Sequence, residues 1–279
     1  MEEHLLALPE VVGFGFRYDV LQLDLDEDVL DRSGIEQSLT KTLGELGITE
    51  LAYRYVGRHI VPFKRPGEGI RRDGFPGTAT LGCFARSNKG YYYALTARHF
   101  TGELEGTLIS SLNEEPLGTL AKVHYKTDIA AILVMRFPLK PLGLEYFLRD
   151  AQNLALKICC ELLTDYQTPM NVYIIGAQSR PGLGRLVSTR YYFGALSHLL
   201  LIESLTPASP FCRPGDSGAI VIGRVSHNKV IAIGMVIGRS DLESRCPTQF
   251  LAVRLDHSLP ALEEQLEDKL HLITSSANQ

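Results

Sequence analysis

The sequence has no hydrophobic run long enough to cross a membrane as a helix. The longest apolar stretches, such as Ile129–Met135, fall well short of the ~18 residues that a spanning helix needs. The chain begins Met1-Glu2-Glu3-His4, with neither a basic start nor an apolar signal region. We therefore expect a cytoplasmic protein that does not associate with a membrane.

Cysteine is scarce and positive charge is not in excess. Five cysteines are an odd number, so at least one thiol is unpaired within the chain. No CxxC pair and no His/Cys cluster at metal-ligand spacing is present, so we expect a reduced protein without a metal or an organic cofactor. The 32 Asp/Glu outnumber the 28 Lys/Arg, and this balance gives no reason to expect a nucleic-acid partner.

Length and composition are those of an ordinary globular protein. The 279 residues are 45% hydrophobic and 22% charged, which is ample for a core that needs no cross-link. The charge is uneven, because residues 1–50 carry 12 acidic and only three basic side chains. This asymmetry indicates either a domain boundary near the end of the acidic stretch or a single solvated acidic face.

The first part of the chain, residues 1–61, reads as a small α/β unit. Apolar residues alternate with others over residues 11–25, which is typical of one or two strands. Ser33 followed by Glu36 matches a capping box and predicts a helix that begins there. Another strand is expected over Leu51–Val56, which gives the order strand, helix, strand.

This unit contains no set of residues that looks chemical. Arg54 lies on a predicted strand and is most simply interpreted as part of a solvated face. We therefore expect residues 1–61 to be a docking or regulatory unit that could bind a protein partner. Residues 62–75 are rich in glycine, proline and basic residues, a composition typical of a linker.

Residues 76–279 divide into many short β runs with few helices. Such runs separated by turns are typical of barrels or sandwiches. Near the end, Ser258–Leu272 is amphipathic, and Ser258 is a plausible N-cap for a C-terminal helix. The clearest strands are expected at Thr78–Phe84, Tyr91–Thr96, Ile129–Val134, Val172–Ile175, Ala219–Ile222, Val230–Val236 and Phe250–Val253.

Three short segments stand out because of their order along these β runs. They are Thr96-Ala97-Arg98-His99, Asp128-Ile129-Ala130 and Gly215-Asp216-Ser217-Gly218. Taken alone, each is ordinary turn or strand-end sequence. Together they resemble the chymotrypsin/trypsin-like serine proteases, which carry Thr-Ala-X-His, Asp-Ile-Ala and Gly-Asp-Ser-Gly in this order. The resemblance spans roughly residues 76–272.

The resemblance implies a mainly β fold of two antiparallel β-barrels with the active site between them. A C-terminal helix and the small N-terminal α/β unit complete this expected architecture. It also implies that Ser217 is the nucleophile, His99 the general base and then acid, and Asp128 the orienting carboxylate. These residue types suit that chemistry, because a neutral imidazole can take the proton of a serine hydroxyl and a buried carboxylate fixes its tautomer.

Two neighbours of the nucleophile have implied roles of their own. In the family, the backbone N–H groups at the positions of Gly215 and Ser217 form the oxyanion hole. The aspartate at the position of Asp216 pairs, in secreted relatives, with an amine freed by cleavage before a segment like Ile-Val-Gly-Gly. No such segment starts the first barrel here, so we expect Asp216 to pair with an arginine or with backbone donors, without that activating cleavage.

By resemblance, the base of the substrate pocket falls at Phe211, or at Ser209 if the loop is shifted, next to Cys212. The aspartate that selects Lys or Arg is missing from this place, so we expect a neutral or apolar side chain before the cleaved bond. Cys212 and Cys246 fall near the positions of a disulfide in secreted relatives. A bridge between them and two free thiols both stay open, with the reduced compartment favouring the thiols.

The wall of the pocket is expected from Val236, Ile237 and Gly238. The resemblance makes this an edge strand that pairs with the substrate backbone. Arg239 follows it and argues for an acidic substrate side chain instead. Thr248 is expected to line the opposite wall.

We therefore predict a cytoplasmic serine endopeptidase that acts on protein or peptide substrates through an acyl-enzyme. Three alternatives stay open. One is a catalytically silent binding module with a protease fold. Another is an esterase or acyl transferase that uses the same triad. The last is a latent protease controlled by residues 1–60.

Overall fold

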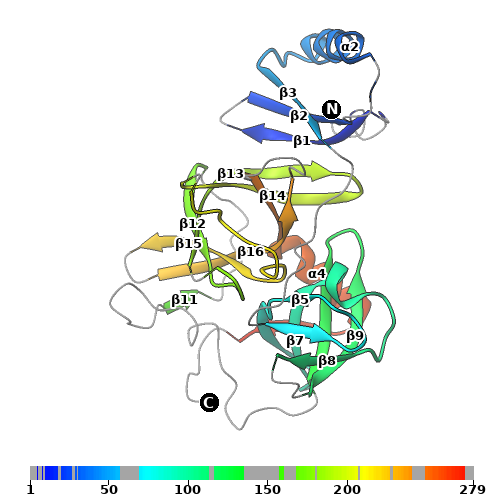
Figure 1. Ribbon diagram of the computed structural model, residues 1–279, viewed down its shortest axis with the longest axis vertical. Coiled ribbons are helices and arrows are strands. Elements are labelled where there is room, and N and C mark those ends of the chain that lie inside the picture. Colours follow the sequence, from blue (N-terminus) through cyan, green and yellow to red (C-terminus); the bar gives the residue numbers. More distant parts are fainter. Residues whose placement is uncertain are drawn as a thin grey trace.

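The computed structural model describes residues 5, 8, 10–17, 20–26, 29, 31–56, 69–112, 116–134, 157–159, 168–179, 181–206, 208–226, 229–240 and 249–273. Their strands form two large sheets, with one small helical unit at the end of the second sheet (Figure 1). Within these ranges, no helix is both long and apolar enough to span a bilayer.

The N-terminal unit has the order strand, strand, helix, strand. It comprises β1 (Val11–Arg17), β2 (Val20–Asp26), α2 (Arg32–Glu45) and β3 (Leu51–Val56). β1 and β2 are antiparallel and β2 and β3 are parallel, so α2 is the crossover that joins them. The leucines of β2 pack with those of α2 in a separate small core.

The helix of this unit begins slightly earlier than the sequence predicts. Asp31 is the N-cap, and its carboxylate accepts a hydrogen bond from the Gly34 amide at 2.9 Å. The predicted cap at Ser33 is therefore wrong by two residues, because Asp31 already satisfies a free amide of the first turn.

The first sheet has the order β18-β6-β7-β10-β9-β8-β4-β5. Its β4 lies inside residues 62–75, the range expected to be a linker, because the apolar Ile70 is buried within that basic stretch. The strands are β4 (Ile70–Arg72), β5 (Thr78–Ala79), β6 (Cys83–Ser87), β7 (Tyr92–Ala97), β8 (Leu108–Ser111), β9 (Pro116–His124), β10 (Ile129–Val134) and β18 (Leu270–Leu272). The short helix α3 (Arg98–Thr101) follows β7 directly.

The second sheet has the order β12-β15-β16-β17-β14-β13-β1-β2-β3. Because β12 pairs with both β15 and β13, the strands from β12 to β13 close into a barrel. They are β12 (Met170–Ile174), β13 (Gly182–Phe193), β14 (Leu196–Ser204), β15 (Ile220–Ser226), β16 (Lys229–Arg239) and β17 (Gln249–Arg254), and β11 (Lys157–Cys159) pairs alongside β16.

The N-terminal unit is docked on the second barrel, because β1 pairs antiparallel with β13 (Figure 1). Gly13 lies opposite Phe193, and Gly15 lies opposite Tyr191. A Cβ atom at Gly13 would lie 2.3 Å from the Tyr192 carbonyl oxygen, and one at Gly15 would lie 2.4 Å from the Tyr191 ring. The two glycines therefore permit an approach that no larger residue allows.

The C-terminal helix is shorter than predicted and begins earlier. α4 spans Leu255–Leu266, and Ser258 lies inside it with its hydroxyl donating to the Arg254 carbonyl oxygen. Glu267 adopts a left-handed conformation that ends the helix. The rest of the expected helix instead forms β18, which pairs with β6.

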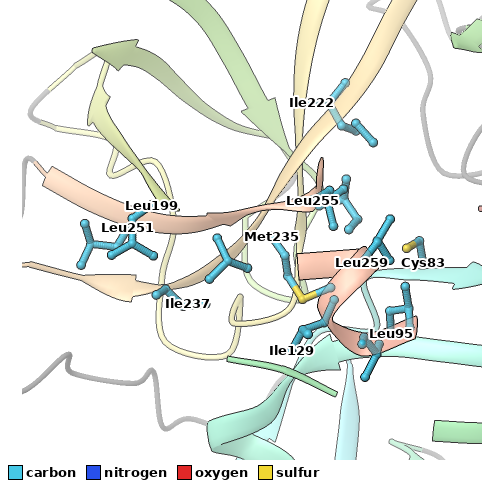
Figure 2. Packing of buried hydrophobic residues seen from close by; sticks show 14 of the residues in the cluster. Cys83, Leu95, Ile129, Leu199, Ile222, Met235, Ile237, Leu251, Leu255 and Leu259 are labelled. Atoms are coloured by element: carbon cyan, nitrogen blue, oxygen red, sulfur yellow. The ribbon is translucent and has the colours of Figure 1, made fainter. Parts of the chain in front are cut away.

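One hydrophobic core joins the two barrels. Cys83, Leu95 and Ile129 of the first sheet belong to the same buried cluster as Met235 of the second. In Figure 2, α4 lies among these side chains, with Leu255 and Leu259 between the two sheets. Helix α4 therefore fixes one barrel against the other.

Candidate active site

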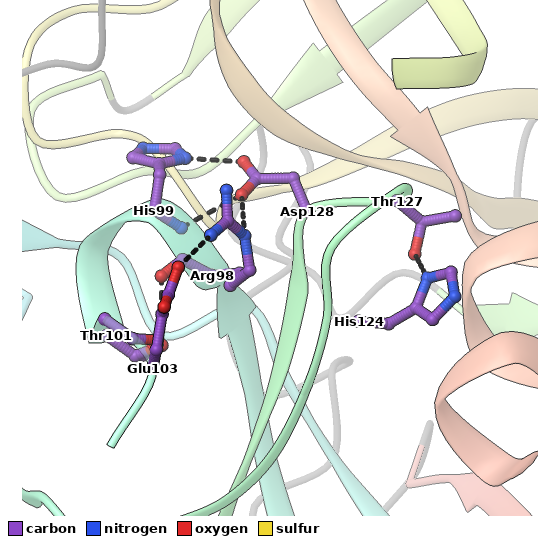
Figure 3. Close-up of polar contacts among 8 residues, drawn as sticks. Arg98, His99, Thr101, Glu103, His124, Thr127 and Asp128 are labelled. Carbon is purple, nitrogen blue, oxygen red and sulfur yellow. Dashed lines mark hydrogen bonds and ion pairs between the residues drawn. The ribbon is translucent and has the colours of Figure 1, made fainter. Parts of the chain in front are cut away.

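The first barrel brings His99 and Asp128 together at neighbouring strand ends. His99 lies in α3, just after β7, and Asp128 comes immediately before β10. Because Ile129 pairs with Ala97, the two side chains emerge side by side. The His99 Nδ1 and Asp128 Oδ2 atoms are 2.5 Å apart, and the His99 amide donates to Asp128 Oδ1 at 2.9 Å (Figure 3).

The carboxylate of this pair is buried and held from a second side. The Asp128 side chain is 5% exposed, and that of His99 is 19% exposed. Arg98 Nε lies 3.3 Å from Asp128 Oδ1, and the Arg98 amide donates to the Asp128 carbonyl oxygen at 2.9 Å. Asp128 itself has φ +47°, an uncommon backbone conformation that aspartate tolerates better than most residues.

Arg98 is a site residue that the sequence interpretation missed. Its guanidinium also contacts Glu103 Oε1 at 3.4 Å and lies 4.9 Å from the centre of the Tyr125 ring. The residue stands between the threonine and histidine of the first motif, at the position that the motif leaves free. No signal in the sequence distinguishes it from an exposed arginine.

Ser217 lies on a loop of the second barrel that contacts the end of β7. The Thr80 amide donates to the Ser217 carbonyl oxygen at 2.8 Å, and the Gly218 amide donates to Val236 at 2.8 Å. Gly218 has φ +95°, and a Cβ there would lie 2.2 Å from the Thr80 carbonyl oxygen and 2.4 Å from Thr96 Oγ1. A glycine is therefore required where this loop meets the first barrel.

In the structure, a hydrogen bond joins His99 and Asp128, whereas the Ser217 hydroxyl is not bonded to either of them. His99 Nε2 and Ser217 Oγ are both buried, and neither has a hydrogen-bond partner within the described ranges. A buried polar atom without a partner is costly for stability, so such atoms call for an explanation. Here the two atoms are the ones that the implied chemistry would bring together.

Gly215 and Ser217, the residues whose amides are predicted to form the oxyanion hole, flank Asp216 on one loop. Gly215 has φ +102°, and its carbonyl oxygen accepts from Thr80 Oγ1 at 2.9 Å. The amides of Gly215 and Ser217 donate to no acceptor among the residues that the structure describes.

Asp216 is fully buried and is held by backbone amides. Its Oδ1 accepts from the Gln178 and Ser179 amides at 2.7 and 3.2 Å, and its Oδ2 accepts from the Arg213 amide at 2.7 Å. A Cβ at Gly176 would lie 2.2 Å from Asp216 Oδ1, so this segment packs closely on the carboxylate. We expected Asp216 to pair with an arginine or with backbone donors, and the described hydrogen bonds to its carboxylate all come from backbone amides.

The predicted base of the pocket lies in the core of the second barrel. Phe211 is fully buried, and its ring centre lies 5.8 Å from that of Phe250. Cys212 is a buried free thiol, and burial, followed by the charge of Asp216, raises its pKa well above the usual value. The Cys212 thiol therefore stays protonated at neutral pH. Cys246 lies outside the described residues.

The predicted wall is not an edge strand along its whole length. Val236 is bonded on one side to Gly218 and Ala219, and β17 flanks the other side. Beyond Val236, Gly238 pairs with Leu251 of β17, and the pairing of β16 with β15 ends at Met235 within the described part of the chain. The correction follows from barrel closure, which pairs most of β16 on both sides and leaves an edge only at its end.

The remaining members of the predicted pocket differ in their surroundings. Ile237 is fully buried in the core between the barrels, and Arg239 is half-buried. Thr248 lies outside the described residues. No group of three or more His, Cys, Asp or Glu side chains within the described ranges could hold a metal ion.

Comparison with known proteins adds information about the fold. No protein-family model matches the chain, and no curated protein matches its sequence. Protease A of Thermobifida fusca is similar in structure, with a TM-score of 0.51 and 18% identity over 75% of this chain and 97% of that chain. A glutamic acid specific serine protease, described as using a novel histidine triad in substrate binding, gives a TM-score of 0.50 and 14% identity over 74% and 98%.

These similarities confirm the predicted fold. The chain has the chymotrypsin/trypsin-like double-barrel architecture, with α4 near the carboxyl end. The loop that carries Ser217 meets Thr80 and the end of β7, the strand that His99 follows.

Proposed function

We propose that this chain is a serine endopeptidase that hydrolyses peptide bonds in protein or peptide substrates through an acyl-enzyme intermediate. One observation carries the proposal. Asp128 holds Nδ1 of His99, while His99 Nε2 and Ser217 Oγ remain buried without partners in the described part of the chain. An imidazole oriented by a carboxylate and a serine hydroxyl without a competing hydrogen bond are the two groups that nucleophilic catalysis requires.

The proposed chemistry follows from these groups. When Ser217 Oγ comes within hydrogen-bond reach of His99 Nε2, as often happens only when substrate binds, the imidazole can act as its base. His99 then takes the Ser217 proton as Oγ attacks the carbonyl carbon, and Asp128 stabilises the imidazolium. His99 returns that proton to the leaving amine. Water attacks the acyl-enzyme by the same route and releases the second product.

The backbone amides of Gly215 and Ser217 would bind the negative oxygen that forms during the attack. Their lack of acceptors in the described ranges supports this role. Fixed donors of this kind stabilise the transition state, and the loss of one costs about 10²- to 10³-fold in rate.

We propose that the site does not depend on cleavage of the chain to supply an amine for Asp216. The carboxylate already accepts three hydrogen bonds from backbone amides, and these bonds hold the loop that carries Ser217. Such donors stabilise the ionised carboxylate as a new amine would.

A peptide substrate would pair with the end of β16, at Ile237–Arg239. This is the part of β16 beyond the Gly218–Val236 bond, where Gly238 pairs with Leu251 of β17. Main-chain pairing of this kind gives affinity, while side-chain pockets give specificity. A neutral or apolar side chain before the cleaved bond remains our prediction, and Arg239 is the residue that argues for an acidic one.

We also propose that the protein works in the reducing environment of the cytoplasm. The buried thiols of Cys83 and Cys212 are both free, which fits a reducing compartment. Burial raises the pKa of Cys83 to about 12, so this thiol is also unreactive at neutral pH.

Labelling with a fluorophosphonate probe, read by intact mass, tests the function directly. We expect one adduct on the wild type and none on Ser217→Ala. Ser188→Ala removes another buried serine hydroxyl, on β13 outside the site, and should label like the wild type. Cleavage of peptide libraries, measured beside simple esters, then separates a peptidase from an esterase.

A latent or silent protease-fold module is the second candidate. The absence of a Ser217–His99 hydrogen bond in the structure favours it. Folded wild-type protein that neither labels nor cleaves peptides would support this candidate and exclude the endopeptidase.

A further inference from the structure

A buried polar network joins the N-terminal unit to the second barrel. Its centre is the Asp24 carboxylate on β2, which is fully buried. Oδ1 accepts from Arg54 Nε at 2.9 Å and from Gln22 Nε2 at 2.9 Å. Oδ2 accepts from Arg54 Nη2 at 2.7 Å and from the Tyr191 hydroxyl of β13. The network therefore crosses the same junction as the β1–β13 pairing.

This arrangement corrects the interpretation of Arg54 as part of a solvated face. Its side chain is 24% exposed and forms a two-point ion pair with Asp24. Burial, followed by the charge of Asp24, raises the pKa of the Tyr191 phenol well above its usual value, so the phenol remains a neutral donor. Buried charges of this kind are costly unless every partner is in place, so the network fixes one docking geometry.

Arg54 also reaches beyond Asp24 to β17 of the second barrel. Its Nη1 donates to Oε1 of Gln249, the first residue of β17. The Gln249 amide nitrogen donates to Glu203 Oε1 at 3.3 Å, so the Gln249 side chain is held from both ends. The Ser240 backbone amide donates to the Gln249 carbonyl oxygen at 3.3 Å. Two hydrogen bonds thus lead from Arg54 to the residue that follows β16.

We infer that Arg54 is a positioning residue for substrate binding, supplied by the N-terminal unit. Through Gln249, it holds the paired ends of β16 and β17, and so sets the place of Ile237–Arg239. The inference rests on the proposed peptidase function, because that function makes this edge the substrate-binding strand. Arg54 does not touch the substrate or the reacting atoms.

The role predicts a selective effect on long substrates. A peptide that pairs with Ile237–Arg239 needs this edge in place. A small ester or a fluorophosphonate needs only the His99–Ser217 chemistry and the oxyanion donors. Loss of the Arg54–Gln249 hydrogen bond should therefore raise KM for long peptides and leave kcat and small-probe reactivity nearly unchanged.

The test compares two variants that remove the Arg54–Gln249 hydrogen bond with a matched control. Gln249→Leu removes the link while Arg54 keeps its pair with Asp24, so this variant is expected to fold. Arg54→Met breaks the link from the other end. Arg32→Leu removes another arginine of the same unit, which lies 4.3 Å from the Tyr55 ring centre and bonds neither Asp24 nor Gln249 in the described contacts.

Steady-state kinetics on a peptide with four residues before the cleaved bond, and on a single-residue ester, provide the readout. We expect Gln249→Leu and Arg54→Met each to raise peptide KM by about threefold to tenfold, with ester kinetics and labelling rates within about twofold of wild type. The double variant should be no worse than the worse single variant, because both break one link. Arg32→Leu should match the wild type.

A conservative variant separates positioning from simple structural support. Arg54→Lys keeps a positive charge against Asp24 but cannot bond Asp24 and Gln249 together as a guanidinium does. We expect it to recover most of the stability that Arg54→Met loses, while peptide KM stays raised. A purely structural role would instead restore KM together with stability.

The possible failures are distinguishable. Unchanged peptide KM in Gln249→Leu, or equal losses on peptide and ester, would overturn the inference while the peptidase function stands. Wild-type protein that neither labels nor cleaves would overturn both, and that result is seen before any variant is made.

Discussion

Two buried aspartates, each beside an arginine, differ in how their hydrogen-bond networks end. Asp24 lies at the junction of the N-terminal unit and the second barrel, and Asp128 lies at the end of a first-barrel strand. At Asp24, the side chains of Gln22, Arg54 and Tyr191 all donate hydrogen bonds to the carboxylate. At Asp128, the chain of contacts passes through His99 and stops at Nε2, which has no partner in the described ranges.

The difference is between a closed network of hydrogen bonds and one that ends at an atom without a partner in the described ranges. Arg54 binds Asp24 through two nitrogens, at 2.7 and 2.9 Å, whereas Arg98 offers Asp128 one nitrogen at 3.3 Å. A closed network resists movement, and one with an open end can exchange a proton. The following changes break or sharpen this contrast, from the largest expected effect to the smallest.

Asp128→Asn should give the largest loss. An asparagine amide cannot hold the His99 tautomer that presents an unprotonated Nε2, so kcat should fall by about 10⁴-fold while the fold persists. Peptide hydrolysis and thermal melting measure the two effects. Asp73→Asn, on an exposed turn of the same sheet, serves as the neutral control. A fall of tenfold or less would mean that Asp128 does not orient the base.

Arg54→Met should mainly lower stability. It leaves the Asp24 carboxylate buried without its cation, a change that costs about 3–5 kcal/mol in other proteins. Urea unfolding, followed by far-UV circular dichroism, measures the free energy of unfolding. A loss below about 1 kcal/mol would contradict the claim that the buried Asp24 network stabilises the junction.

Arg98→Met should show the opposite balance. The Arg98 side chain is 23% exposed and makes a single contact with Asp128, so the free energy of unfolding should fall by only about 1 kcal/mol or less. We expect kcat/KM to fall about tenfold, because the carboxylate loses one of its fixed donors, and Arg98→Lys to recover part of it.

The control for Arg98 is another arginine that lies near a tyrosine ring. Arg86 lies 5.8 Å from the Tyr92 ring centre on the same sheet, and Arg86→Met should leave kcat/KM unchanged. Equal effects of the two substitutions would show that Arg98 acts through general surface charge.

His124→Asn should give the smallest effect, seen only as a change with pH. Burial lowers the pKa of His124, with Lys126 acting in the same direction and Glu264 opposing it. Between the lowered value and about 6.5, the folded chain binds fewer protons than the unfolded chain, so stability falls as pH falls. His124→Asn should therefore make the free energy of unfolding less dependent on pH across this range, as measured by urea unfolding at several pH values. An unchanged slope would contradict the shift.

Local sequence patterns predicted most strands, and they placed the three motifs at strand ends and turns. The segments around His99, Asp128 and Ser217 are each only a few residues long, and a short segment carries its own turn and strand-end chemistry. The strand–helix–strand order of residues 1–61 was also predictable, because apolar periodicity is local information. The pairing of His99 with Asp128 was implied by the family resemblance, and in the structure the pairing of Ile129 with Ala97 brings the two residues together.

Features that depend on distant contacts were not predictable. Arg54 and Gln249 are 195 positions apart, and nothing near either residue indicates the other. The close packing of Phe211 against Gly182 and Gly184 was not predictable either, because the contact joins separate segments of the chain. The end of α4 is decided by the pairing of Leu270–Leu272 with β6, a contact that helical periodicity does not include. Tertiary contacts overrode local pattern in each case.

The pairing of β1 with β13 also affects the order in which the protein can fold. A ribosome delivers Gly13 long before Phe193, the residue opposite which it must lie. The N-terminal unit can form its helix early, but it has to wait for most of the chain before its sheet and the Asp24 network are complete. Closing so large a loop is slow and leaves strand edges open in the meantime. Gln249, which Arg54 also contacts, comes later still, so a chain that ends before it lacks part of the junction between the N-terminal unit and the second barrel.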